Sequence, residues 1–250
     1  MKSKNFDLYS QYYNLLYQDK DYKGEAEYVY GKLKSYSPNL NQILELGSGT
    51  GIHANLLQKK GLYVIGIELS EEMAQQAREK GIECHVNDCS EFSLDKKFDA
   101  VISLFHVISY VTENNNLVKT FQKVYEHLNP GGFFLFDLWY SPAIYNLKPE
   151  TRIKRIENDE LKVIRLAEPV MHYNSNLVDV NYDVIIEEKQ SGKITRINET
   201  HPMRHFSLPE IQLLASFTGF KVIETEEWMT GKQPSENTWG VCFILKKEEL

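Results

Sequence analysis

The order of apolar and polar positions divides the chain into three stretches. In residues 1–40 apolar and aromatic residues recur at helical spacing, and a helix is expected from about Tyr22 to Tyr36, before Pro38. Residues 41–139 alternate short apolar runs with helical segments, which is typical of a parallel sheet with right-handed crossovers. From Arg152 to His205 apolar and polar residues tend to alternate, which predicts antiparallel strands inserted after the fifth strand.

The last part of the chain is expected to return to the main sheet. A hairpin turn is predicted at Gln190 to Lys193, and Ser207 with Glu210 has the spacing of a capping box at the start of a helix. After that helix, two strands are expected near Phe220 to Met229 and Trp239 to Lys246. These two would complete the main sheet as an antiparallel edge.

The segment from Ile43 to Gly51, ILELGSGTG, predicts a buried strand, a glycine-rich turn and the start of a helix. Such a turn brings backbone N–H groups close to a nucleotide cofactor. A dinucleotide-binding turn places its third glycine five residues after the first, whereas Gly51 comes four after Gly47. The spacing therefore speaks against NAD.

A second apolar run, Leu62 to Leu69, contains Glu68 about 20 positions past the turn, where an acid can accept hydrogen bonds from both hydroxyls of a ribose. Ser70 is expected to cap the next helix, whose inner face holds Met73, a residue that could also cover an adenine. We therefore expect a nucleoside at the carboxyl edge of these strands.

Four motifs in order resemble those of the class I S-adenosylmethionine (SAM)-dependent methyltransferases. Glu45 with the glycine turn resembles motif I, Asp88 follows a third strand, Phe98 to His106 resembles motif IV, and Leu128 to Leu138 resembles the fifth strand. The resemblance implies an α/β fold with a Rossmann-like, mostly parallel seven-stranded sheet, helices on both faces and the small antiparallel sheet inserted after the fifth strand. It also implies SAM as cofactor and these contacts to it: Tyr13, Tyr22, Glu45, Gly47, Ser48, Gly49, Gly51, Glu68, Leu69, Met73, Asp88, Cys89 and Leu104.

The layout is most similar to the small-molecule branch of this family, the N-methyltransferases that act on amino sugars carried by a nucleotide. Ser10 to Tyr17 resembles their tyrosine-bearing lid, which implies that Tyr13 and Tyr22 close over the cofactor. The resemblance divides the chain into a lid (1–40), a SAM-binding domain (41–139 and 207–250) and an inserted subdomain for substrate or dimer contacts (140–206). At the end of the fourth strand this chain has Val107 and Tyr110 where those enzymes carry Ser and His, so the acceptor could differ.

Methyl transfer needs a nucleophile held in line with the methyl group and, for an amine, a group that takes its proton. His106, just past the fourth strand, is the leading candidate base, and packing between its neighbours is the alternative. Tyr110 could orient the acceptor, and His201 could reach the cleft from the inserted sheet. Trp139 and Arg204 are candidate substrate contacts, the first through its ring and the second through its planar guanidinium, although a solvated strand face would equally explain Arg204.

Composition fits a globular enzyme and excludes several classes. The chain has 250 residues, 42% of them hydrophobic, and a net charge of −7, which disfavours a nucleic-acid backbone as the main partner. Three cysteines without Cys-x-x-Cys spacing indicate neither disulfides nor a zinc site, so we expect no metal and a cytoplasmic protein. No signal core or membrane span is expected. A homodimer through the inserted sheet would cover exposed strand edges.

The favoured function is N-methylation of a small molecule, with a nucleotide-linked amino sugar as the first choice. An O-methyltransferase for another small metabolite needs the same cofactor residues and stays open. So does a non-catalytic SAM-binding protein. A nicotinamide enzyme is the most distant alternative.

Overall fold

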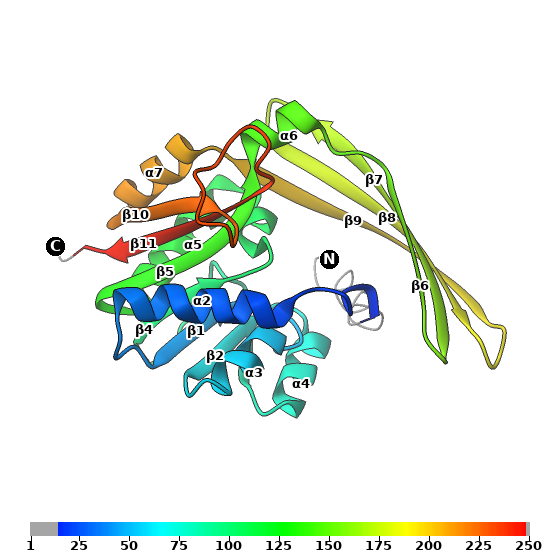
Figure 1. Cartoon of the computed structure of the whole chain (residues 1–250), viewed down its shortest axis with the longest axis horizontal. Helices are drawn as coiled ribbons and strands as arrows, with labels where there is room; N and C mark the ends of the chain where they lie inside the picture. The colour runs from blue at the N-terminus through cyan, green and yellow to red at the C-terminus, as the bar shows by residue number, and fades with distance from the viewer. Residues whose placement is uncertain (1–14, 249–250) are drawn as a thin grey trace.

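The computed structural model describes residues 15–248, and Figure 1 shows a sheet flanked by helices with a second, long antiparallel sheet projecting from it. The parallel part contains β1 (Gln42–Leu46), β2 (Tyr63–Glu68), β3 (Glu83–Val86), β4 (Phe98–Ser103) and β5 (Leu128–Tyr140). The inserted strands are β6 (Arg152–Glu157), β7 (Leu161–His172), β8 (Leu177–Glu188) and β9 (Ile194–Phe206). The final strands are β10 (Phe220–Glu227) and β11 (Gly240–Lys247).

The helices cover both faces of the main sheet, as predicted. On one face lie α2 (Tyr22–Tyr36), α3 (Ile52–Gln58) and α4 (Glu71–Glu79), packed through small and aliphatic side chains such as Ala54 and Ala77. On the other lie α5 (Asn114–His127) and α7 (Leu208–Phe217), which bury Phe121 and Ile211 in a phenylalanine-rich core. A short 3-10 helix, η1 (Val107–Tyr110), and a short helix, α6 (Ser141–Leu147), complete the described elements.

The main sheet has the strand order β3-β2-β1-β4-β5-β11-β10, and β1 to β5 are parallel. The fold prediction, a mostly parallel sheet followed by inserted antiparallel strands, is therefore confirmed. The prediction that the two final strands complete the main sheet as an antiparallel edge is confirmed. Strand β11 runs antiparallel to β5, and the edge strand β10 runs antiparallel to β11.

Strand β5 belongs to both sheets. It pairs with β4 as far as Phe136, and beyond that point the same edge is taken over by β9, through Trp139 opposite His205 and Tyr140 opposite Phe206. On its other edge Trp139 faces Gly240 of β11. The inserted sheet therefore begins where β4 ends, directly above the carboxyl edge of the parallel strands.

Residues 15–21, which precede α2, lie between the two sheets in Figure 1. Leu16 is fully buried against Val163, Val184 and Ile197 of the inserted sheet and against Met73 of α4. The predicted cofactor contact Tyr13 lies outside the described residues, as does the first part of the lid-like stretch that begins at Ser10. Across residues 15–248 the helices are too short or too polar for any of them to cross a membrane.

Candidate active site

The glycine-rich turn after β1 lines a cavity of about 360 Å³ at the carboxyl edge of the parallel strands. Gly47 and Gly49 have φ of +64° and +54°, in the left-handed region that favours glycine. The N–H of Ser48 donates to the carbonyl of Ile67 at 3.0 Å and holds the turn against β2. A Cβ built on Gly49 would meet no atom within 4 Å, so this side of the turn is an open cradle that the missing side chain leaves for a ligand.

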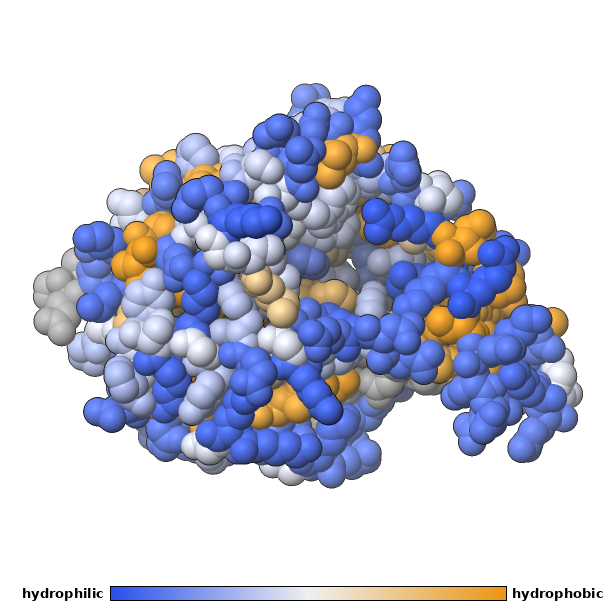
Figure 2. Space-filling model, viewed as in Figure 1, coloured by the Kyte–Doolittle hydropathy of each residue, from blue (hydrophilic) through white to orange (hydrophobic). Residues whose placement is uncertain are grey.

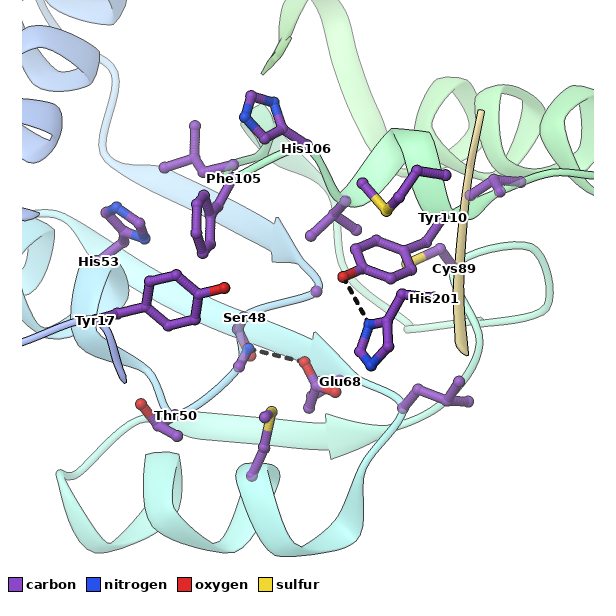
Figure 3. A pocket seen from close by; sticks show the side chains of 18 of the residues that line it. Tyr17, Ser48, Thr50, His53, Glu68, Cys89, Phe105, His106, Tyr110 and His201 are labelled. Carbon is purple, nitrogen blue, oxygen red and sulfur yellow. Dashed lines mark hydrogen bonds between the residues drawn. The ribbon is translucent and has the colours of Figure 1, made fainter. Parts of the chain in front are cut away.

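Glu68, at the end of β2, connects the glycine turn to the start of α4. Its Oε2 accepts a hydrogen bond from the N–H of Gly49 at 2.8 Å, and its Oε1 accepts one from the N–H of Ser70 at 2.9 Å. Burial raises the pKa of this carboxyl, although the backbone N–H groups oppose the shift. Glu68 lines the cavity beside the turn, which is the position expected of the ribose contact (Figure 3).

The remaining predicted cofactor contacts in the described part are mostly brought to the same wall. The 2.8 Å and 2.7 Å hydrogen bonds from the N–H and hydroxyl of Ser90 hold Asp88 through its Oδ1. Predicted residues that line the cavity are Tyr22, Gly47, Ser48, Gly49, Glu68, Leu69, Met73, Asp88, Cys89 and Leu104. Within residues 15–248 no group of three or more His, Cys, Asp or Glu side chains is arranged to hold a metal ion.

Two predicted cofactor contacts, Glu45 and Gly51, are placed behind the turn and do not line the cavity. Glu45 is 2% exposed, and burial, followed by repulsion from Glu68, raises its pKa to about 8 against a hydrogen bond from the backbone of Ala54. Gly51 has φ of +75° and leaves no room for a side chain, since a Cβ there would lie 2.9 Å from the Cβ of Ala77. These two residues therefore lie behind the turn, outside the cavity lining.

The lid side of the cavity contains Tyr17 and Tyr22. The ring of Tyr17 packs edge-on against Phe105 with centroids 5.0 Å apart, and the Nζ of Lys20 lies 4.4 Å from the centre of the Phe105 ring. Lys20 also pairs with Glu25 of α2. Burial alone would raise the pKa of the Glu25 carboxyl, but its contacts with His53 and Lys20 outweigh it and the pKa is lowered. Tyr17 was missed as a cavity residue, although it belongs to the stretch that resembles the lid.

At the end of β4 the backbone turns sharply and presents His106 to the cavity. Phe105 and His106 have φ of +63° and +62°, which is uncommon for residues with side chains and is concentrated at functional sites. The Nδ1 of His106 lies 2.7 Å from the Oδ2 of Asp137, and the His106 N–H also donates to this carboxylate at 3.2 Å. Asp137 therefore places a carboxylate directly beside the imidazole of His106.

Asp137 was not singled out from the sequence. It is 1% exposed on β5, inside the apolar run that begins at Phe133. Burying an acid in the middle of a strand costs free energy unless the acid has a partner. An acid within a buried apolar run is therefore the sequence signal that could have identified Asp137.

The inserted sheet supplies the opposite wall. The hydroxyl of Tyr110 lies 3.1 Å from the Nδ1 of His201, and the Nε2 of His201 lies 3.1 Å from the Oε2 of Glu199. Figure 3 shows Tyr110 and His201 joined by a hydrogen bond in the cavity that Glu68 also lines. The structure therefore brings the three candidate chemical residues, His106, Tyr110 and His201, to one cavity.

Of the two predicted substrate contacts, only Trp139 lines the cavity, with its ring 6.3 Å from that of His106. Arg204 is placed elsewhere. Its guanidinium donates to Glu210 at 2.6 Å, to Asn114 at 2.7 Å and to the carbonyl of Thr112 at 3.2 Å. Because Arg204 ties β9 to α7 and to the start of α5, its placement does not support a substrate contact.

Comparisons with known proteins agree with this geometry. Residues 43–132 match the family of methyltransferase domains. The chain is 27% identical over 229 residues, 90% of this chain and 94% of the relative, to the dTDP-3-amino-3,4,6-trideoxy-alpha-D-glucopyranose N,N-dimethyltransferase of Streptomyces venezuelae.

Two solved structures share the architecture over nearly the whole chain. The sugar N-methyltransferase KedS8 from Streptoalloteichus is 23% identical, with a TM-score of 0.82 over 95% of this chain and 93% of that chain. A SAM-dependent methyltransferase from Clostridium acetobutylicum is 21% identical, with a TM-score of 0.79 over 95% of this chain and 96% of that chain. Residues 43–132 therefore match a methyltransferase domain, and the chain shares the fold of these two solved methyltransferases.

Proposed function

We propose that this protein is a SAM-dependent methyltransferase that transfers a methyl group to an amino group of a small molecule. The observation that carries the proposal is a single cavity lined both by residues suited to a nucleoside and by a histidine suited to accept a proton. Glu68 and the turn at Gly49 lie on one side of it, and His106, backed by Asp137, lies on the other.

The residues of the first wall fit the cofactor. The open cradle at Gly49, the buried carboxylate of Glu68 and the anchored carboxylate of Asp88 supply room and hydrogen-bond acceptors for a nucleoside. The flexible side chain of Met73 and the flat ring of Tyr22 supply apolar surface that can cover a nucleoside. SAM, when bound, supplies an activated methyl group on a sulfonium.

The rest of the chemistry is carried by the chain itself. Holding an acceptor in line contributes about 7–11 kcal/mol to lowering the barrier in well-oriented systems. Acceptance of the amine proton by a positioned base contributes about 10² to 10⁴ in rate. His106 has the required partner, because Asp137 stabilises the charge that its ring gains, and Trp139 offers an aromatic surface to the acceptor.

The favoured acceptor is an amino sugar carried by a nucleotide. The support for this choice is the similarity, over nine-tenths of the chain, to a dimethyltransferase named for a dTDP-linked amino sugar. The architecture that the chain shares with a sugar N-methyltransferase is consistent with it.

The test is binding followed by turnover. Isothermal titration calorimetry should detect SAM and S-adenosylhomocysteine (SAH), and Glu68→Ala should weaken both by at least about a hundredfold, because two charge-assisted hydrogen bonds are lost. Glu91→Gln, an exposed acid outside the cavity, is the matched control. No heat with either ligand would overturn the cofactor assignment.

Incubation with methyl-labelled SAM and a panel of dTDP-linked amino sugars and free amines should give products heavier by one or two methyl groups in mass spectrometry. Label that appears only on oxygen would favour the O-methyltransferase alternative. Cofactor binding without any labelled product from a cell extract would favour a non-catalytic SAM-binding protein.

We also propose the division into a lid (1–40), a SAM-binding domain (41–139 and 207–250) and an inserted substrate or dimer subdomain (140–206). A homodimer through the projecting sheet is supported by the hydrophobic patches on its surface in Figure 2 and by the exposed side chains of Ile153, Val170 and Ile194. Analytical ultracentrifugation checks this assembly. The three free cysteines are consistent with a reducing, cytoplasmic location.

A further inference from the structure

Strand β9 buries two polar side chains where the alternation of the strand calls for apolar ones. Its inward face carries Ile197, Glu199, His201 and Met203, which are all buried. Glu199 is 5% exposed and His201 is 3% exposed. Buried polar groups of this kind are stable only within a satisfied hydrogen-bond network, so the pair must serve a specific arrangement.

Glu199, His201 and Tyr110 form a series of contacts that reaches the cavity. Glu199 contacts the Nε2 of His201, and the Nδ1 of His201 contacts the hydroxyl of Tyr110, each at 3.1 Å. Tyr110 and His201 line the cavity, and the series connects η1 of the main domain to the inserted sheet.

The direction of the hydrogen bonds in this series is determined by its far end. A carboxylate can only accept, so the nitrogen that faces Glu199 must carry a proton. In a neutral imidazole the other nitrogen, Nδ1, is then an acceptor, and Tyr110 must donate its single hydroxyl proton to it. Any further group that bonds to the Tyr110 oxygen has to be a donor.

The surroundings keep the proton on Tyr110 and pack an aromatic ring against His201. Burial, followed by the neighbouring Tyr182, raises the pKa of the Tyr110 phenol, which therefore keeps its proton. Tyr182 lies opposite Glu199 in the sheet and packs edge-on against His201, with ring centroids 4.8 Å apart. The guanidinium carbon of Arg165 lies 4.9 Å from the centre of the Tyr182 ring and places a positive charge in the same layer as the Glu199 carboxylate.

The charge of the cavity wall also favours an amine over an anionic group. The described residues that line the cavity include no lysine and no arginine, so this wall offers no cationic side chain to a phosphate or a carboxylate. The diphosphate of a nucleotide-linked substrate would have to lie outside this wall.

We propose that Glu199, acting through His201, makes the Tyr110 oxygen a hydrogen-bond acceptor for an N–H donor of the substrate. This hydrogen-bond relay of Glu199, His201 and Tyr110 would admit an amine and disfavour an oxyanion. The inference rests on the proposed function for the identity of the reaction. The direction of the hydrogen bonds in the relay does not depend on that function. Tyr110 touches the acceptor, whereas Glu199 is a positioning residue.

The first test reads the relay without any substrate. In the SAH-saturated protein, ¹⁵N–¹H correlation spectra of the histidine rings, assigned with His201→Asn, should show His201 protonated on Nε2 and bare on Nδ1. Glu199→Gln should shift these signals, because an amide can also donate. A proton on Nδ1 in the unaltered protein would overturn the proposal, as would identical His201 signals in Glu199→Gln.

The second test measures selection. Cyclohexylammonium and cyclohexanecarboxylate have the same body and opposite hydrogen-bonding ends, and NMR titration into the SAH-saturated protein should show that only the amine binds in the cavity. Tyr110→Phe and Glu199→Gln should each weaken the amine about tenfold, the size expected for a hydrogen bond to a charged group, while SAH affinity stays unchanged. Glu187→Gln, at a partly exposed acid on β8 outside the cavity, is the matched control.

Equal binding of the two probes, or no loss in Tyr110→Phe, would refute the inference. Selective amine binding with no methyl transfer to any amine would instead refute the proposed function and leave the relay standing. The two failures are therefore distinguishable.

Discussion

At the scale of single residues, the contact between His106 and Asp137 gives the sharpest test of the proposed proton acceptor. Asp137→Asn removes the negative charge 2.7 Å from the imidazole and keeps an oxygen for the His106 N–H. Because the protonated ring then loses its counter-charge, we expect kcat at neutral pH to fall about tenfold to a hundredfold, with SAM affinity unchanged.

Steady-state kinetics together with calorimetry measure this. His172 and Asp179 form an exposed pair at 2.9 Å on the inserted sheet, so Asp179→Asn is a control with the same chemistry away from the cavity. Unchanged kcat in Asp137→Asn would exclude His106 as the base, and a parallel loss of SAM binding would indicate a structural role.

Glu45 predicts a pH dependence of stability. Its pKa is raised from 4.5 to about 8, mainly by burial, so between these values the folded state holds a proton that the unfolded state has released. Raising the pH through this window therefore favours unfolding. We expect the free energy of unfolding to fall, relative to Glu45→Gln, by up to about 1.4 kcal/mol for each pH unit.

Urea denaturation of both proteins at pH 5.5 and pH 7.5 measures the difference. Exposed Glu91→Gln should follow the unaltered protein at both values. Parallel curves for Glu45→Gln and the unaltered protein would show that the buried carboxyl is not protonated across this window.

Residue by residue, the sequence located the cofactor wall better than the opposite one. Glu68 and Asp88 follow strands in consecutive βα units, so their place at one edge follows from local order and the handedness of the crossovers. The contact between Tyr110 and His201 joins positions 91 residues apart and depends on how β9 registers against β8 and β5. No local pattern carries that register, so Glu199 was missed although it shares the strand phase of His201.

At the scale of elements, replacing Gly31 or Gly51 by alanine is expected to change the stability of the protein in opposite directions. Gly31 lies inside α2, and an added Cβ would meet nothing within 4 Å, so Gly31→Ala should stabilise the protein by about 0.5–1 kcal/mol. Gly51 has positive φ and faces Ala77, so Gly51→Ala should destabilise it by about 1–3 kcal/mol or more.

Thermal and urea unfolding of the two variants measure this contrast. If both changes have the same sign, the turn before α3 relaxes without cost, which would contradict the close approach of Gly51 to Ala77 of α4.

Elements with strong periodicity were predicted nearly to the residue. The helix over Tyr22 to Tyr36 and the helix and strands after Ser207 are examples. The predicted capping box was not formed, because Ser207 makes no side-chain cap and Glu210 pairs with Arg204 instead. A long-range ion pair here outcompetes a local cap, and the same pair explains why Arg204 is not at the cavity.

At the scale of the whole molecule, Leu16 connects the lid side of the cavity to the inserted sheet and to helix α4. It is fully buried among Val163, Val184 and Ile197 of the insert and Met73 of α4, which itself lines the cavity. Truncating a buried leucine costs about 2–5 kcal/mol, and part of that loss should fall on the closed lid. Leu16→Ala should therefore weaken SAM binding by at least about tenfold.

Calorimetry and hydrogen exchange of residues 15–22 measure this effect. Leu213→Ala, at a side chain 74% exposed on α7, is the control and should leave both unchanged. Full SAM affinity in Leu16→Ala would show that the packing of Leu16 does not contribute to SAM binding.

The continuity of β5 through both sheets sets how this architecture can diversify. A change in the length of the β8–β9 hairpin alters only its far tip, since the near end is anchored by Trp139 and Tyr140 opposite His205 and Phe206. Acceptor preference can thus drift by substitutions on one face of the insert while the cofactor edge keeps its register. A library restricted to the inward positions of β7 to β9 is accordingly the most economical starting point for redirecting this scaffold to new amines.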